Sequence, residues 1–146
     1  MVSKSYETFE HGADIGIRGY GKTLEEAFSN LIKALFSLIG EEVDFNKIAA
    51  DQRVEIKVEA DFLEELVVIF INKVLSLFAL ENVFFKEFKG KIWESDQRVR
   101  LEGTLLGEKY SPEKFGYGVE VKGATFTLAK VERKGDLWIA QCVVDV

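Results

Sequence analysis

The segment from Phe62 to Leu80 restricts the possible folds of this chain more than any other feature, because it is apolar on almost every side. Its centre, Leu66 to Ile71, contains no polar residue. A membrane-spanning helix is disfavoured, since the segment also carries Glu64, Glu65, Asn72, Lys73 and Ser76. A helix without a clean polar face usually has neighbours on several sides. We therefore expect a central helix from Asp61 to about Leu80 that packs against a sheet.

Another helix is expected earlier in the chain, between Thr23 and Gly40. Thr23 and Glu26 form a capping box at its start, and Gly40 could end it in the left-handed conformation. Asp61 and Glu64 are the equivalent capping pair for the central helix. The earlier helix should have one buried face, because its apolar residues follow helical spacing at Leu24, Ala27, Phe28, Leu31, Ile32, Leu35, Phe36 and Ile39.

Segments with a period of two predict strands around these helices. Turns are expected at Ser95-Asp96 and at Lys134-Gly135-Asp136, and the region from Gly107 to Gly118 should be the one long loop. The order of elements predicts a single α+β domain over residues 1–146, mostly antiparallel sheet with two main helices on one face. The expected strands contain Ile15 and Ile17, Val54 to Val58, Phe88 to Trp93, Val99 to Leu105, Val119 to Arg133 and Leu137 to Val144.

Composition excludes several classes of function. The formal net charge is -6, with 25 acidic and 19 basic residues, which argues against direct binding of nucleic acid. One cysteine and one histidine exclude a disulfide framework, a multi-cysteine zinc site and a histidine cluster. Cys142 lies in an apolar strand and is expected to be buried and inert. With no apolar signal segment at the N-terminus, a cytoplasmic location is expected.

Two acids near the ends of the chain stand inside apolar strand sequence. They are Asp14, between Ala13 and Ile15, and Asp145, which adjoins the terminal carboxylate of Val146. If the strands bring them together, three carboxylates converge, and a cation or a proton must relieve their repulsion. Oxygen ligands favour calcium or magnesium over zinc. The alternative is that both acids are solvated at strand ends.

Other polar residues have two interpretations each. His11 could act as an acid, a base or a ligand, or it could simply cap the turn that Gly12 allows. The period-two pattern places Glu120 and Lys122 on one face of a strand, where such neighbours are commonly solvated. The glycines at Gly16, Gly19 and Gly21 are not in the dinucleotide-binding order.

Three separated blocks of the sequence resemble the archease family. The first runs from Glu10 to Gly21 (EHGADIGIRGYG) and is followed by the helix start at Thr23. The second runs from Val119 to Phe126 (VEVKGATF) and the third from Trp138 to Val146 (WIAQCVVDV). The resemblance extends from about Tyr6 to the last residue. On these blocks the chain is identified as a member of the archease family, of a bacterial-type variant.

This resemblance implies a small cytoplasmic protein that activates the RtcB-type RNA ligase and is not itself an enzyme. It would promote GTP-dependent guanylylation and multiple turnover of the ligase in tRNA splicing or RNA repair. GTP would bind the ligase and not this chain, and neither nucleic acid nor a membrane would be a direct partner.

The resemblance also implies a metal site on the carboxylates of Asp14, Asp145 and Val146. Calcium is the expected ion, with magnesium or manganese as alternatives. Lys122 belongs to the functional residues of the family, and His11 and Glu120 lie in its signature blocks. Two other classes of function stay open at this point, namely a chaperone-like interaction module and, more remotely, a metal-dependent hydrolase.

Overall fold

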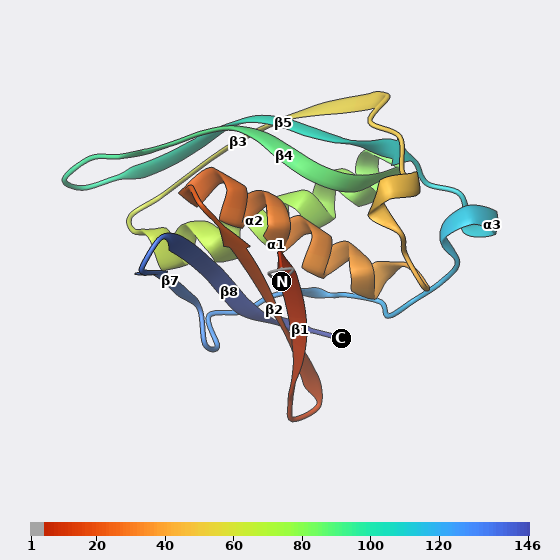
Figure 1. Cartoon of the computed structure of the whole chain (residues 1–146), viewed down its shortest axis with the longest axis horizontal. Helices are drawn as coiled ribbons and strands as arrows, with labels where there is room; N and C mark the ends of the chain where they lie inside the picture. The colour runs from red at the N-terminus through yellow and green to blue at the C-terminus, as the bar shows by residue number, and fades with distance from the viewer. Residues whose placement is uncertain (1–4) are drawn as a thin grey trace.

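Two antiparallel sheets enclose two long helices (Figure 1). The structure is a computed structural model that describes residues 5–146. The helices are α1 (Leu24–Ile39) and α2 (Leu63–Glu81). The five-stranded sheet has the order β1 (Tyr6–His11), β2 (Asp14–Gly21), β8 (Leu137–Asp145) and β6 (Gly123–Ala124), with β7 (Lys130–Lys134) also paired to β8. The three-stranded sheet has the order β3 (Gln52–Ala60), β5 (Val99–Lys109) and β4 (Val83–Glu94).

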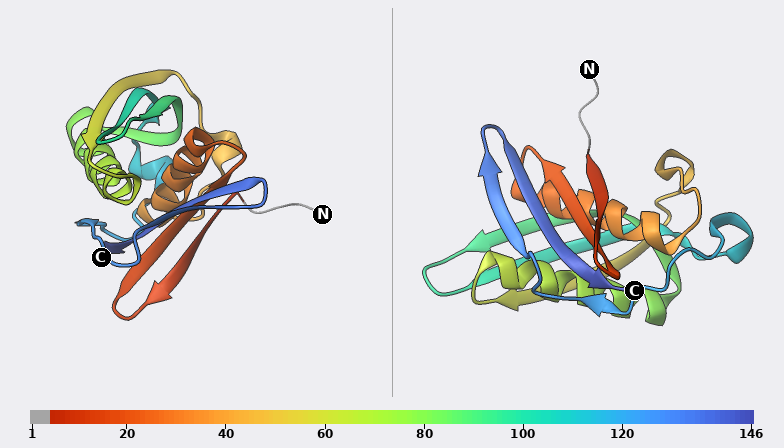
Figure 2. Two further views of the ribbon diagram at one scale, coloured as in Figure 1. Left: turned by 90° about the vertical axis from the view of Figure 1, so that its left-hand side faces the viewer. Right: turned by 90° about the horizontal axis from the view of Figure 1, so that it is seen from below.

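The predicted α+β class with two main helices and antiparallel sheet is confirmed. The expectation of a single sheet is wrong, because the strands form two sheets and the helices lie between them (Figure 2). Each helix contacts strands of both sheets. Sequence periodicity could not distinguish one sheet from two, because it predicts where a strand lies in the chain but not which strand it pairs with.

Helix α1 packs closely against β2 on one side and β4 on the other. Gly19 allows this approach, because a Cβ there would lie 2.2 Å from the carbonyl oxygen of Ala27 in α1. Side chains of α1 also accept hydrogen bonds from the edge of β4 that pairs with no other strand in residues 5–146. The backbone N–H of Phe88 donates to Ser29, and that of Ile92 donates to Glu25. The edge strand is thereby protected from pairing with another chain.

The central position predicted for α2 is confirmed, since it contacts β3 on one side and β6 and β7 on the other. Its predicted cap is wrong. The N-cap residue is Phe62, which supplies no side-chain cap. The carboxylate of Asp61 accepts a hydrogen bond from Arg98 instead, and Glu65, not Glu64, accepts the backbone N–H of Asp61. No helix in residues 5–146 is long and apolar enough to cross a membrane.

Helix α1 starts at Thr23 and ends at Gly40 as predicted, but the conformation predicted for Gly40 is wrong. Thr23 accepts the backbone N–H of Glu26 at 3.1 Å, as in a capping box. Gly40 has a φ of -98° and is not left-handed. The last carbonyl groups of α1 are bound by a distant segment, because Gly118 N donates to Ile39 O and Val119 N donates to Leu38 O.

Several predicted boundaries also need correction. The region from Gly107 to Gly118 is not one loop, because β5 continues to Lys109 and a short helix, α3 (Pro112–Phe115), follows. A 3₁₀ turn, η1 (Phe45–Lys47), precedes β3. Residues 119–122 do not form a strand, and the expected strand up to Arg133 consists of β6 and β7 with a turn between them. Strand β1 was not predicted, since its burial does not alternate cleanly.

We expect the Cys142 thiol to be unreactive in the folded protein. The side chain is fully buried, and burial raises its pKa from 9.0 to about 12. Because the folded pKa is the higher one, the neutral thiol contributes stability that is lost as the pH rises above about 9. Thiol titration with an aromatic disulfide at pH 8 should give no reaction until denaturant is added. Equal rates with and without denaturant would contradict this burial.

Candidate functional site

Three strands of the five-stranded sheet, β1, β2 and β8, bring three predicted site residues into one row. His11 pairs with Asp14 across a tight turn in which Gly12 has a φ of +61°. Ile15 of β2 pairs with Val144 of β8, and continuing this antiparallel register by one residue places Asp14 opposite Asp145. On its other side, Asp145 pairs with Gly123 of β6. Residues opposite each other in an antiparallel sheet project from the same face, so His11, Asp14 and Asp145 form what we call the acid row.

The acid row faces away from the helices. Ile17 and Val144 belong to the core between the sheets, and alternation along each strand turns Asp14 and Asp145 to the opposite face. Asp145 and His11 are exposed, and Asp14 is half-buried. The backbone N–H of Val146 lies 3.4 Å from Asp14 Oδ1, which brings the end of the chain beside this carboxylate.

The groups at this end of the sheet that could bind a metal ion are carboxylate oxygens. Among residues 5–146, no three His, Cys, Asp or Glu side chains are arranged to hold a metal, so the terminal carboxylate would have to supply the third group. Carboxylates of Asp14, Asp145 and Val146 suit a hard cation such as calcium, whose six to eight ligands would be completed by water or a partner. The arrangement is compatible with the predicted site, and cation binding stays a prediction.

The other two predicted residues lie in a groove beside the acid row. The groove has a volume of about 480 Å³ and runs between α2 and residues 119–122. Glu120 and Lys122 both line it and are exposed, although not as neighbours on a regular strand. The backbone N–H of Lys122 donates to Asp145 O at 2.8 Å. This bond joins the groove to the acid row.

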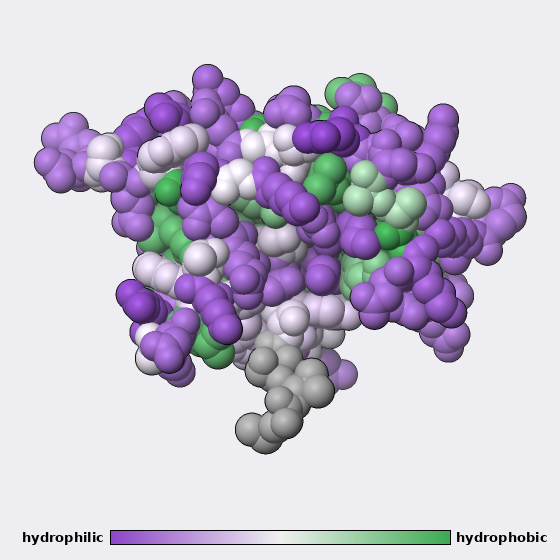
Figure 3. Space-filling view, turned by 45° about the horizontal axis from the view of Figure 1, so that its top comes forward, coloured by the Kyte–Doolittle hydropathy of each residue, from purple (hydrophilic) through white to green (hydrophobic). Residues whose placement is uncertain are grey.

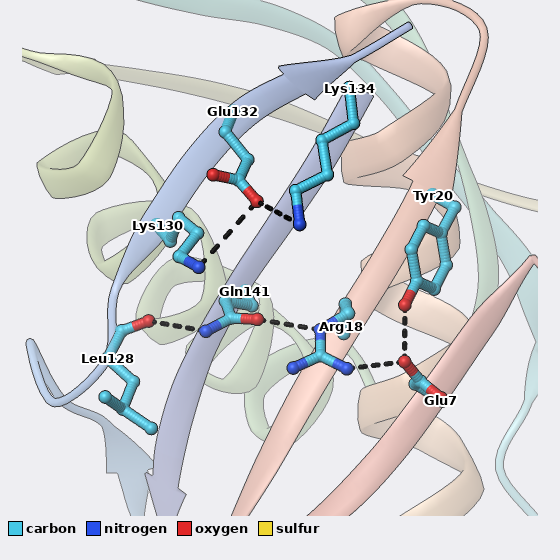
Figure 4. Close-up of polar contacts among 8 residues, drawn as sticks. All are labelled: Glu7, Arg18, Tyr20, Leu128, Lys130, Glu132, Lys134 and Gln141. Carbon is cyan, nitrogen blue, oxygen red and sulfur yellow. Dashed lines mark hydrogen bonds and ion pairs between the residues drawn. The ribbon is translucent and has the colours of Figure 1, made fainter. Parts of the chain in front are cut away.

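A chain of polar contacts crosses the same outer face of the sheet (Figure 4). Gln141 of β8 donates to the carbonyl of Leu128 and accepts from Arg18 of β2. Arg18 and Tyr20 both donate to Glu7 of β1. Burial, followed by the hydrogen bond to Glu7, raises the pKa of Tyr20. No pattern in the sequence indicated this network, which connects β1, β2 and β8 to the turn that follows β6.

One residue of the predicted glycine series also belongs to this face. A Cβ at Gly16 would lie 2.1 Å from the ring of Phe9, so the glycine leaves room for this ring. The Arg18 guanidinium in turn lies 4.5 Å from the centre of the Phe9 ring. Packing explains this glycine, and the rejection of a nucleotide-binding motif is consistent with its place within a strand.

The fold and site define a class of small α+β protein, in which two helices lie between two antiparallel sheets and an acid row ends one of them. Residues 6–146 match the model of the archease protein family (MTH1598/TM1083). The chain belongs to the archease family.

Relatives match over almost their whole length. The chain is 43% identical to the archease of Pyrococcus furiosus, over 98% of this chain and 99% of that one. It is 35% identical to the archease of Methanosarcina barkeri, over 98% and 97%. The solution structure of protein 1598 of Methanobacterium thermoautotrophicum has a TM-score of 0.80 and 28% identity, covering 97% of this chain and 99% of that one. The predicted family is therefore confirmed.

Proposed function

We propose that this protein is a non-catalytic, cytoplasmic activator of an RtcB-type RNA ligase. It promotes the GTP-dependent guanylylation of the ligase and so allows multiple turnover. Membership of the archease family is the observation that carries this proposal. The acid row and the adjoining Lys122 support it, because they gather the residues of the family's signature blocks at one end of the molecule. Splicing of tRNA and RNA repair are the processes in which the ligase would act.

The proposed contribution of the acid row is to bind a divalent cation, calcium first and magnesium or manganese as alternatives. Asp14, Asp145 and the carboxylate of Val146 would hold it, and the ion would supply positive charge where the partner is guanylylated. The chain's own residues would present these oxygens from the end of a sheet that the outer-face polar network stiffens. GTP would be bound and used by the ligase.

The chaperone-like alternative has less support from the surface. A chaperone needs a large continuous apolar area. The face in Figure 3 is mostly hydrophilic, with small separate apolar areas. The large apolar side chains that are exposed are Phe62, Leu80, Trp93, Tyr117, Val119, Phe126, Leu128 and Leu137.

The proposal predicts that substoichiometric amounts of this protein raise the turnover of the ligase. The measurement is RNA ligation by the RtcB-type ligase of the same organism, with GTP and manganese and with RNA in excess over ligase. We expect several rounds of ligation per ligase with the protein and about one without it, along with faster guanylylation. The protein alone should join no RNA and hydrolyse no phosphoester. Unchanged turnover and guanylylation, with both proteins folded, would refute the proposed function.

A further inference from the structure

Asn72 is a polar residue on the central helix α2, and its side chain reaches the short strand β6. Its side-chain Oδ1 accepts the backbone N–H of Ala124 at 2.8 Å. Asn72 also lines the groove that contains Glu120 and Lys122. A helix side chain therefore takes the place that a neighbouring strand would have at this edge of the sheet.

The bond to Asn72 completes the anchoring of residues 122–125. On the side of β8, Lys122 N donates to Asp145 O and Thr125 N donates to Val143 O. On the side of α2, Asn72 is the partner of Ala124. Val121 and Ala124 also pack against the hydrophobic core, and the bond from Asn72 adds a directional contact that fixes the Ala124 N–H at α2.

Lys122 lies two residues before the residue that Asn72 holds. Its side chain is exposed and forms no ion pair or hydrogen bond with residues 5–146, so only its backbone is held. Two peptide units separate Lys122 N, bound to Asp145, from Ala124 N, bound to Asn72. A shift of β6 away from α2 would therefore move Lys122 relative to α2, which forms the other wall of the groove.

We propose that Asn72 is a positioning residue, which by holding Ala124 sets the position of Lys122 in the groove beside the acid row. This inference rests on the proposed function, in which Lys122 and the acid row meet the ligase together. Asn72 itself touches neither the acid row nor a reacting group. Its effect on activation passes through β6, and the acceptor oxygen is the atom that matters.

Three variants test this role in the multiple-turnover ligation assay. Asn72→Leu keeps the size of the side chain but removes the acceptor, and we expect activation to fall roughly three- to tenfold, the range of one hydrogen bond. Asn72→Asp keeps an acceptor oxygen and should restore activation to near the wild-type level. Lys73→Ala changes the exposed neighbour on the same helix and should have no effect. Amide exchange of Ala124 should be faster in Asn72→Leu and unchanged in Asn72→Asp.

A double-mutant cycle separates positioning of Lys122 from a general structural effect. In a Lys122→Ala background, Asn72→Leu should add little, because its target is already gone. The role of Asn72 would be overturned if the Asn72→Leu variant activated the ligase as well as the wild-type protein does. It would also be overturned if the losses of activation caused by Asn72→Leu and Lys122→Ala simply added. Both outcomes leave the activator function unaffected. Absence of activation by the wild-type protein would instead overturn the proposed function.

Discussion

Replacing Phe36 with alanine should lower the free energy of unfolding by about 3–5 kcal/mol, the usual cost of removing a buried phenylalanine. Phe36 is fully buried on α1. Its ring centre lies 5.4 Å from that of Phe78 on α2, and 4.9 Å and 5.8 Å from those of Phe84 and Phe85 on β4. One side chain thus joins both helices to the three-stranded sheet, and alanine would leave a cavity where they meet.

Urea unfolding followed by circular dichroism measures this loss, and the melting temperature should fall by roughly 6–20 °C. Phe62→Ala is the matched control, because that side chain is 50% exposed and its removal should cost far less. The slope of unfolding free energy against urea should stay the same in both variants. A loss below about 1 kcal/mol for Phe36→Ala would show that the aromatic contacts do not join these layers.

The parts of the fold that could be predicted are those fixed by local interactions. Helix α1 and its Thr23 cap follow from residues close in sequence. The left-handed conformation predicted for Gly40 was wrong, because the last carbonyl groups of α1 are bound by Gly118 and Val119, which no local rule connects with Gly40. Asp61 is a good capping residue by type, but its carboxylate is engaged by Arg98.

In the candidate site, too, single residues could be predicted from the sequence, but their arrangement in space could not. An acid within apolar strand sequence was a sufficient signal to single out Asp14 and Asp145, because such a residue needs a partner or water. Their register could not be read from the sequence, since it depends on pairing between opposite ends of the chain. Asn72 was visible only as a polar interruption of an apolar helix, and its bond to Ala124 needed the structure.

Calcium should raise the melting temperature of the wild-type protein if the acid row binds it. Binding to the folded state alone stabilises by about 2.7 kcal/mol when the free ion is at 100 times its dissociation constant. For a chain of this size, that gain corresponds to roughly 5–11 °C. Thermal unfolding with increasing calcium, and separately with magnesium and manganese, measures the shift and ranks the ions.

Asp145→Asn tests whether the shift comes from the acid row. The change removes the charge of one ligand, and a loss of about 100-fold in affinity would reduce the calcium stabilisation from about 2.7 to about 0.4 kcal/mol at the same free calcium. Without calcium the variant should be no less stable than the wild type, because Asp14 then loses a like-charged neighbour across the strands. Asp136→Asn, in the exposed turn between β7 and β8, removes the same charge at the other end of β8 and should keep the full shift. Equal calcium shifts in all three proteins would place the ion elsewhere, and no shift with any of the three ions would refute the proposed cation site.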